Sequence, residues 1–255
     1  MLGRTSHYRN TAIAADDQRA LPASTSLRST TVAGLRRMAR RMLPRQVLRQ
    51  APFVMRQIHK WHMYTPYFVA QKVIFIHVPK AAGTSVALAL FGHDPGHYTA
   101  LDYRNRNPGR FRAYFKFGFV RNPWDRLLST YVYAFKHTRI YPNNQVSFIV
   151  EFPTFESFIM EWVNPKNIRR NYFMLPQVDY LCDRRGNLIV DFVGRFENLE
   201  EDFEALCSRL QVSATLPMVN ATTHPDYRSQ YTKEMADAVA SAYRDDIEFF
   251  GYDFD

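Results

Sequence analysis

The sequence predicts an α/β fold, with a mostly parallel central sheet flanked by helices, and three observations support it. Residues 72–78 (KVIFIHV) form an almost unbroken apolar run, as expected for a parallel strand covered on both faces. Residues 114–120 form a second strand-like segment, in which three phenylalanines alternate with other residues. Each segment leads into a stretch with helical periodicity. We therefore expect one α/β domain over residues 70–255.

The first two helices follow these strands directly. After the first strand, a turn of small residues leads into a predicted helix over residues 84–91. The second helix begins after Asn122, which can cap it, and has Pro123 and Asp125 in its first turn. Its buried stripe is predicted to contain Leu127, Leu128, Tyr131 and Phe135.

The middle of the domain carries a helix signal and a turn signal. Residues 155–162 have the apolar spacing of an amphipathic helix. Residues 180–182 and 188–193 are apolar and flank the polar segment 183–187 (DRRGN). This pattern predicts a β-hairpin with its turn at that segment.

The C-terminal part of the sequence is predominantly helical in pattern. Asn198 followed by Glu201 resembles a capping box at the start of a helix over residues 199–210. A last helix is predicted from about residue 233 to residue 250. We interpret its acidic residues, Asp245, Asp246 and Glu248, as a solvated face and not as a metal site.

The positive charge of the chain is concentrated at its N-terminus. The formal net charge is +9, but residues 1–60 hold 12 Lys and Arg against two Asp, whereas residues 61–255 hold 21 basic and 22 acidic residues. We interpret residues 1–60 as a basic N-terminal extension, disordered over 1–32 and helical over 34–59 with a break at Pro44. A solvated arm is the favoured interpretation, and contact of residues 34–60 with an anionic surface is the alternative.

Composition argues against several classes of protein. Two cysteines, Cys182 and Cys207, cannot build a disulfide framework and lack zinc-ligand spacing. No apolar run approaches the roughly 18–20 residues that span a bilayer, and the N-terminus lacks the apolar stretch of a secretory signal. We therefore expect a cytoplasmic protein with no transmembrane segment and no metal.

The segment 77–85 (HVPKAAGTS) has the pattern of an anion-binding loop. A buried strand ends, a tight turn of small residues follows, and a helix begins at two hydroxyl residues. The N-terminus of a helix presents unpaired N–H groups and partial positive charge, and Lys80 adds a full charge. The lysine precedes the glycine, so the segment is not the G-x-x-x-x-G-K-[ST] loop of nucleoside triphosphate binders.

A second anion-binding pattern lies at residues 119–129 (FVRNPWDRLLS). Arg121 follows the end of a strand, and a helix begins immediately after it. Ser129 lies two helical turns later, where its hydroxyl can face the same side. Because open α/β sheets bind ligands at the carboxyl ends of their strands, one ligand with phosphates at both ends would account for both patterns.

These segments resemble the two phosphate-binding loops of sulfotransferases that use 3′-phosphoadenosine 5′-phosphosulfate (PAPS). The resemblance is closest to the group related to carbohydrate O-sulfotransferases such as heparan sulfate 2-O-sulfotransferase, and it runs from about residue 72 to the C-terminus. It also includes the segments HYTA (97–100), DYLC (179–182), GRFENL (194–199) and FFGY (249–252).

The resemblance implies roles for individual residues. Lys80 would stabilise charge on the leaving phosphate and is therefore both catalytic and donor-binding. The 5′-phosphate would lie on the backbone and hydroxyls of Ala82, Gly83, Thr84 and Ser85, and the 3′-phosphate on Arg121 and Ser129. Arg228 would belong to a late loop that closes over PAPS. The acceptor would be a hydroxyl compound, for which a carbohydrate is one candidate.

Transfer of a sulfuryl group also needs a base that takes the proton of the acceptor hydroxyl, and a histidine suits this task. His97 is the best candidate, because the resembling family has a histidine between its two loops. His93 is the alternative, and the Gly and Pro residues around both predict an exposed loop. We interpret His77, inside the first strand, as a core histidine.

Two other functions are compatible with the sequence. A nucleotide kinase with a divergent phosphate loop would bind ATP with magnesium in preference to a nucleoside bisphosphate. A nucleic-acid-binding or membrane-binding protein would act through its basic N-terminal extension, with an inactive or regulatory domain behind it. The prediction that accounts for both loops is a PAPS-dependent sulfotransferase.

Overall fold

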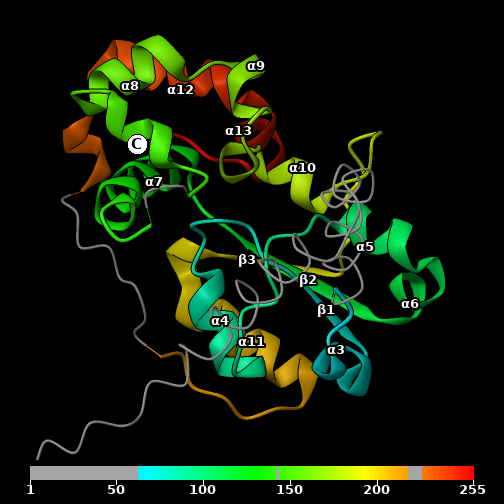
Figure 1. Cartoon of the computed structure of the whole chain (residues 1–255). Helices are drawn as coiled ribbons and strands as arrows, with labels where there is room; N and C mark the ends of the chain where they lie inside the picture. Colours follow the sequence, from blue (N-terminus) through cyan, green and yellow to red (C-terminus); the bar gives the residue numbers. More distant parts are fainter. Residues whose placement is uncertain (1–62, 142–143, 218–225) are drawn as a thin grey trace, which may run out of the picture. The chain divides into compact units, whose positions relative to one another are not determined.

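The computed structural model describes residues 63–141, 144–217 and 226–255, shown in colour in Figure 1. Contacts within the chain divide it between residues 56 and 57, and every described residue belongs to the second unit. The predicted disorder of residues 1–32 and the broken helix over 34–59 lie outside the described residues. The extent of the extension and of the domain therefore stays a prediction.

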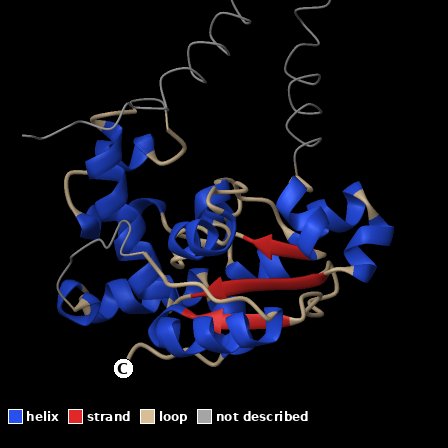
Figure 2. Cartoon of the chain, turned by 90° about the horizontal axis from the view of Figure 1, so that it is seen from below, coloured by secondary structure: helices blue, strands red, loops and turns tan. Residues whose placement is uncertain are grey.

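Three parallel strands form the central sheet, which confirms the predicted α/β class. They are β1 (Val73–Ile76), β2 (Phe115–Val120) and β3 (Phe192–Arg195), in the order β1-β2-β3. Figure 2 shows the strands pointing in one direction with helices around them. Because all three run the same way, the loops that follow them meet at one edge of the sheet.

The helices fall into three groups along the chain, and no helix among the described residues is long and apolar enough to cross a membrane. Before β2 lie α3 (Pro66–Gln71), α4 (Gly83–Phe91), α5 (Ala100–Arg106) and α6 (Pro108–Ala113). Between β2 and β3 lie α7 (Pro123–Thr138), α8 (Phe155–Trp162), α9 (Pro165–Ile168) and α10 (Gln177–Leu181). After β3 lie α11 (Leu199–Leu210), α12 (Lys233–Ala242) and α13 (Arg244–Phe250). Short 3₁₀ turns occur at Ser147–Glu151, Tyr172–Met174, Phe196–Asn198 and Tyr227–Gln230.

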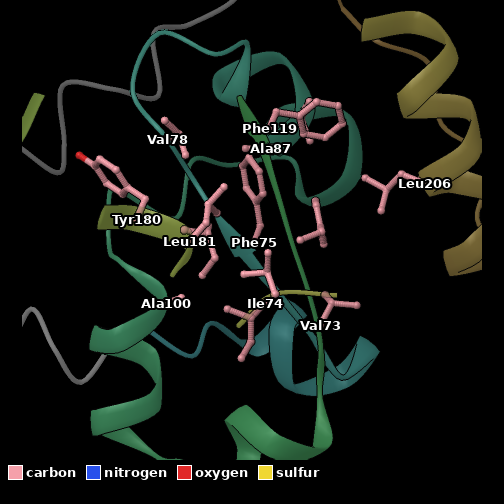
Figure 3. Close-up of a cluster of buried hydrophobic side chains, with 14 of the residues drawn as sticks. Val73, Ile74, Phe75, Val78, Ala87, Ala100, Phe119, Tyr180, Leu181 and Leu206 are labelled. Carbon is pink, nitrogen blue, oxygen red and sulfur yellow. The ribbon is translucent and has the colours of Figure 1, made fainter. Parts of the chain in front are cut away.

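Helices cover both faces of the sheet, as the apolar strands predict. On one face, Phe117 stacks on Phe75 with ring centroids 5.1 Å apart and lies 6.4 Å from Phe91 of α4. On the other face, a Cβ on Gly118 would come within 2.8 Å of Leu181, so this glycine lets α10 approach closely. Figure 1 shows α4 and α11 on one side of the sheet, and Figure 3 shows part of this core.

A second buried cluster lies among α7, α8 and α12. The predicted α7 residues Leu127 and Leu128 are buried there, and Asn122 caps α7 by accepting hydrogen bonds from two backbone N–H groups, as predicted. Tyr131 is partly buried, but Phe135 is 40% exposed, so its assignment to the buried stripe was wrong. The buried stripe of α7 is therefore shorter than predicted. It ends at Tyr131, whose ring lies 4.9 Å from the ring of Phe155 in α8.

The predicted hairpin around residues 183–187 was wrong. The turn exists, but only Cys182 and Leu188 form an antiparallel bridge across it. Residues 180 and 181 end helix α10, and residues 192–195 pair with β2 as the parallel strand β3. The cause is tertiary, because the Asp246 carboxylate accepts hydrogen bonds from the first two N–H groups of α10 and so favours a helix there.

Two features of the C-terminal helices also differ from the sequence predictions. Asn198 makes no side-chain cap on α11, and Asp202 instead accepts a hydrogen bond from the Arg195 backbone, so the capping box was wrong. The last helix is two helices, α12 and α13, which meet at the buried Tyr243. This break turns Asp246 inward, where it is fully buried and not part of a solvated face.

Candidate active site

A cavity of about 440 Å³ lies where β1 and β2 end. Eight of the nine residues predicted for the site line it: Lys80, Ala82, Gly83, Thr84, Ser85, His97, Arg121 and Ser129. The ninth, Arg228, is not a lining residue of this cavity; it lies in the 3₁₀ turn after residues 218–225 and pairs with Asp226. The structure thus brings both predicted anion-binding loops to one cavity.

The loop between β1 and α4 has an unusual backbone. Lys80 and Ala82 both adopt left-handed conformations, with φ of 66° and 59°, which residues with a side chain rarely occupy. Ala82 is the N-cap of α4 and forms no side-chain cap. The N-cap residue therefore offers no side-chain acceptor to the first turn of α4, whose residues Gly83, Thr84 and Ser85 line the cavity.

Lys80 extends from this loop over an aromatic ring. Its Nζ lies 4.4 Å from the centroid of Tyr133, and its carbonyl oxygen accepts a hydrogen bond from Arg121 Nη1 at 3.2 Å. Burial, with the charges of Arg121 and Lys136, lowers the pKa of Lys80 to about 8. Within the described residues, no carboxylate pairs with this ammonium group, which leaves it suited to an anionic ligand.

Arg121 is held rigidly at the end of β2. Its Nε donates to Asp125 Oδ2 at 2.7 Å, its guanidinium lies 3.8 Å from the Phe196 ring centroid, and the residue is 5% exposed. Its backbone N–H and C=O both pair with the side-chain amide of Gln177. Ser129 lines the same cavity from two turns further along α7.

A buried arginine that the sequence analysis did not single out braces the site. Arg126 Nε donates to the Pro79 carbonyl at 3.1 Å, and Nη2 donates to the Leu175 carbonyl at 2.7 Å. Its Nη1 lies 3.8 Å from Asp246 Oδ2, with both side chains buried. Arg126 thus ties the loop before α4 to α7 and to the segment before α10.

His97 lies against the cavity in a defined tautomer. Its Nδ1 lies 2.9 Å from the carbonyl oxygen of His77, and a carbonyl can only accept, so Nδ1 carries the proton. Nε2 is then left with a lone pair. Burial, with the nearby His77, lowers the pKa of His97 to about 4, so the ring is neutral at physiological pH. His93 is not a lining residue; its Nδ1 bonds to the Phe91 carbonyl.

His77 is buried and satisfied, as predicted for a core histidine, but it also lines the cavity. Its Nδ1 bonds to Asp94 Oδ1 at 2.9 Å. Burial would raise the pKa of Asp94, but the hydrogen bond and charge of His77 outweigh it and lower that pKa to about 2. The His77 ring also packs on Gly83, where a Cβ would come within 1.9 Å of His77 Cδ2. Gly83 is therefore required sterically.

An aromatic wall, formed by Tyr133, His137 and Phe173, lines the His97 side of the cavity. Tyr133 stacks on His137 with centroids 3.9 Å apart and lies nearly parallel to Phe173 at 5.8 Å. Phe173 in turn meets His97 edge-on at 5.2 Å. None of these three aromatic residues was predicted from the sequence to belong to the site. The i, i+4 spacing of Tyr133 and His137 on one helix face was the available signal, whereas Phe173 gave none.

The cavity has two chemically different halves. One half holds the start of α4 and Arg121, whose guanidinium lies against Phe196, and the cavity lining also includes Leu199, Glu200, Leu216 and Pro217. The other half holds His97 and the aromatic wall, and Lys80 lies at the junction. Among the described residues, no three His, Cys, Asp or Glu side chains gather as metal ligands. The arrangement can bind a phosphorylated ligand beside a neutral histidine that can accept a proton.

Comparison with known proteins gives one family and one relative. The profile of a family described as "Sulfotransferase family" matches residues 67–253, which is more than half of the chain. An uncharacterized protein from Archaeoglobus fulgidus is 30% identical over 121 residues, which cover 46% of this chain and 86% of that protein. No solved structure matches the chain significantly.

Proposed function

Because the chain belongs to the sulfotransferase family, we propose that it transfers a sulfuryl group from PAPS to an acceptor hydroxyl. One observation carries the proposal: Lys80, Arg121 and the first turn of α4 line the same cavity as the neutral His97. PAPS carries anionic groups at both ends of its adenosine, and this cavity presents cationic or N–H-rich groups at two places. The residues present therefore fit this donor.

The half of the cavity that contains Arg121 and the start of α4 supports the donor assignment. The first turn of α4, where Gly83, Thr84 and Ser85 line the cavity and Ala82 supplies no side-chain cap, would bind the 5′-phosphate, because helix N-termini attract anions. Arg121 and Ser129 would bind the 3′-phosphate. Apolar side chains from Phe196 to Pro217 line the cavity and would contact the adenine. Arg228 does not line the cavity, so its role in a loop that closes over PAPS rests on the family resemblance alone.

The aromatic wall supports a ring-shaped, uncharged acceptor. Phe173 and the aromatic residues beside it line this part of the cavity, and aromatic rings pack well against the C–H groups of a sugar. Lys80 and Arg121 are the only cations among the described lining residues, and the donor would occupy both. We therefore propose a neutral sugar hydroxyl as the acceptor, in preference to a uronate or a sulfated sugar, which would need further cations.

The chemical step follows from the positions of three groups. The acceptor oxygen attacks sulfur, an O–S bond forms, and the bond from sulfur to the phosphate oxygen breaks. The acceptor proton passes to Nε2 of His97, whose Nδ1–H stays on the His77 carbonyl. The Lys80 ammonium stabilises the negative charge that develops on the departing phosphate oxygen. The Asp94–His77–Gly83 contacts hold His77, and therefore its carbonyl, in place.

Calorimetry with adenosine 3′,5′-bisphosphate tests the donor assignment. We expect the folded full-length protein to bind it, and Lys80→Ala and Arg121→Ala to weaken binding at least tenfold each, about 1.4 kcal/mol, because each removes a charge that meets a phosphate. Arg139→Ala, an exposed cation outside the cavity, is the matched control. Absence of binding by the wild type, or stronger magnesium-dependent binding of ATP, would refute the proposal and favour a kinase.

Transfer to a matched pair of acceptors tests the acceptor class. Methyl glucoside and methyl glucuronide differ only in a hydroxymethyl group against a carboxylate. With radiolabelled donor, we expect faster transfer to the neutral glycoside, and slower transfer to both acceptors in Phe173→Leu, because the variant removes an aromatic ring from the wall and adds no cation. Equal or faster transfer to the glucuronide would contradict a neutral acceptor while leaving PAPS dependence intact.

A further inference from the structure

His77 has a second ring nitrogen, Nε2, that the chemical step leaves unused. The residue directly follows β1, is 2% exposed and lines the cavity together with the first turn of α4. The ring of Phe75 stacks on the imidazole with centroids 5.5 Å apart, and the ring of His97 lies at 4.1 Å. These contacts fix the orientation of the imidazole, so each of its nitrogens has a defined environment.

Asp94 determines which nitrogen of His77 carries the proton. Its Oδ1 lies 2.9 Å from His77 Nδ1 and also accepts a hydrogen bond from the Gly96 N–H at 2.8 Å. Burial raises the pKa of Asp94, but the hydrogen bonds and charges around it lower that pKa to about 2. The side chain is therefore a carboxylate, which can only accept, so Nδ1 of His77 is the protonated nitrogen.

The other nitrogen, Nε2, lies beside the start of α4. A Cβ on Gly83 would lie 2.3 Å from Nε2 and 1.9 Å from Cδ2, so this edge of the ring rests on the Gly83 backbone. Within the described part of the chain, no group forms a hydrogen bond with Nε2, and the bond to Asp94 satisfies Nδ1 alone. An almost fully buried ring thus keeps one unpartnered nitrogen next to the proposed site of the 5′-phosphosulfate.

The charge of His77 decides whether this nitrogen repels or attracts an anion. In the neutral ring Nε2 carries a lone pair, which repels a phosphate or sulfate oxygen. In the imidazolium both nitrogens donate, so Nε2–H can bind the anion while Nδ1–H stays on Asp94. The Asp94 carboxylate and the bound anion would then both favour the positive ring.

The other groups that face His77 act in both directions. Besides Asp94, six titratable or charged side chains line the cavity among the described residues: Lys80, His97, Arg121, Tyr133, His137 and Glu200. The two histidines are neutral at physiological pH, because burial is the main cause that lowers the pKa of each, and burial raises the pKa of the tyrosine. Lys80 and Arg121 oppose a positive charge on His77 while the cavity is empty. An anion that neutralises them removes this repulsion and so favours protonation of His77.

We propose that His77 binds the 5′-phosphosulfate of the donor as an imidazolium, so that the protein takes up a proton when PAPS binds. This role of His77 depends on the PAPS-dependent function that we propose. A positive His77, 4.1 Å from His97 between ring centroids, also opposes protonation of His97. The base therefore stays neutral until the acceptor hydroxyl delivers its proton. At saturating PAPS the proton on His77 is already bound, so it does not enter the pH dependence of transfer to a varied acceptor.

Calorimetry of PAPS binding without an acceptor tests this role of His77. Titrations in pairs of buffers with different heats of ionisation give the number of protons taken up at each pH, over the range from about 5 to 8 in which histidines titrate. The full-length wild type is compared with His77→Asn, which keeps a donor to Asp94 and lacks Nε2. His93→Asn, which changes a histidine outside the cavity, is the matched control. The 3′-phosphate of PAPS titrates alike in all three proteins, so it cancels in the comparison.

We expect the wild type and His93→Asn to take up at least about half a proton at some pH in this range, and to bind PAPS more weakly as the pH rises. His77→Asn should take up less and should bind PAPS roughly tenfold more weakly at the acidic end, because it lacks the charged donor. If PAPS bound with equal proton uptake to the wild type and His77→Asn, the role of His77 would be wrong and the donor assignment would stand. Absence of PAPS binding by the wild type would instead refute the proposed function.

Asp94→Asn gives a second test that leaves the buried ring in place. Asparagine still accepts a hydrogen bond from His77 Nδ1, but it lacks the negative charge that favours the imidazolium. We expect PAPS affinity to fall roughly tenfold at the alkaline end of the range and the proton uptake to move about one unit toward acidic pH. Unchanged affinity and uptake would mean that no imidazolium forms beside Asp94, which would overturn the role of His77.

Nitrogen NMR of the histidine-labelled protein reads the charge of His77 directly. In the PAPS complex, both ring nitrogens of His77 should give the shifts of protonated imidazolium nitrogens, whereas His97 should keep one nitrogen with a lone pair. A neutral His77 ring in the PAPS complex would overturn the proposal, whatever the effect of the substitutions on stability.

Discussion

The two strand–loop–helix units at the candidate site treat their helix N-termini in opposite ways. At α7, Asn122 Oδ1 accepts from the N–H groups of Trp124 and Asp125, at 3.1 Å and 3.5 Å. At α4, the N-cap is Ala82, which has a left-handed backbone and makes no side-chain cap. The side chain of Asn122 therefore caps the first turn of α7, whereas the N-cap residue of α4 supplies no side-chain acceptor.

This difference assigns different chemistry to the two units. The α4 unit would bind an anion with backbone N–H groups and with Lys80, whose carbonyl is held by Arg121. The α7 unit would bind with side chains only, through Arg121 and Ser129, and its capped helix serves as a rigid support. The left-handed backbone at Lys80 and Ala82 is a strained conformation of the kind that often occurs at ligand-binding sites.

Removing the charge of the α4 unit should have the largest effect. We expect Lys80→Ala to lower kcat for sulfuryl transfer by roughly a thousandfold, because Arg121, the other cation among the described lining residues, is assigned to the 3′-phosphate in the proposed mode of binding. The measurement is transfer from radiolabelled donor at saturating acceptor. A loss of less than about tenfold would mean that the α4 unit does not carry the developing charge.

Removing the base should have the next largest effect. His97→Asn should lower kcat by roughly a hundredfold, since the lone pair on Nε2 is lost. His93→Asn, the matched control outside the cavity, should transfer at nearly the wild-type rate. The reverse order of the two variants would assign the base to His93.

The pH dependence of kcat/KM separates the contributions of these two groups. His97 has a pKa lowered to about 4, so it accepts protons above that pH, and Lys80 has a pKa lowered to about 8, so it is charged below that pH. A bell-shaped profile is expected, falling below about pH 4 and above about pH 8. In Lys80→Arg the alkaline fall should disappear, because arginine stays protonated. If kcat/KM of Lys80→Arg still fell above about pH 8, the alkaline fall would belong to another group.

A change at the α7 cap should affect stability and leave ligand binding intact. Asn122→Ala removes the cap and also the hydrogen bonds that Asn122 Nδ2 donates to Tyr227 OH and the Asp253 carbonyl. We expect the free energy of unfolding to fall by about 2 kcal/mol, measured by urea denaturation. Asn122→Asp, which keeps the cap acceptor, should lose less. If folded Asn122→Ala bound the bisphosphate more weakly, the α7 cap would contribute to ligand binding as well as to stability, and the proposed difference between the two units would be wrong.

The smallest effect is expected at the strained α4 cap. Ala82→Gly relieves a left-handed backbone with φ of 59° and should raise the free energy of unfolding by up to about 1 kcal/mol. Bisphosphate affinity should stay close to that of the wild type, because the α4 N–H groups are unchanged. Lower stability in this variant would show that the left-handed backbone at Ala82 costs the protein little.

Sequence reasoning predicted the part of the cavity that contains Lys80 and Arg121 better than the part that contains the aromatic wall. Lys80 and Arg121 each follow an apolar strand, and the carboxyl ends of parallel strands share one edge, so their proximity follows from local pattern alone. Tyr133 and Phe173 lie far apart in sequence, and they meet only because Arg126 ties the Phe173 and Leu175 carbonyls to α7. Local pattern carries no signal for such a contact.

Contacts between residues distant in the sequence also explain why some predictions of the fold were wrong. Residues 180–182 have the composition of a strand, but the buried Asp246, more than sixty residues later, accepts hydrogen bonds from the start of α10 and holds a helix there. The acidic run around Asp246 looks solvated because its neighbours are charged. Only the break at Tyr243, whose hydroxyl donates to the Met174 carbonyl, turns Asp246 into the core.

Local features of the sequence sufficed to predict an α/β fold with two loops at one edge of the sheet, because apolar strands, small turn residues and helix starts are all local patterns. The tautomer and neutrality of His97 and the aromatic wall became visible only in the tertiary structure. Each of these depends on groups distant in sequence that meet only after folding, and burial then sets their pKa and their partners.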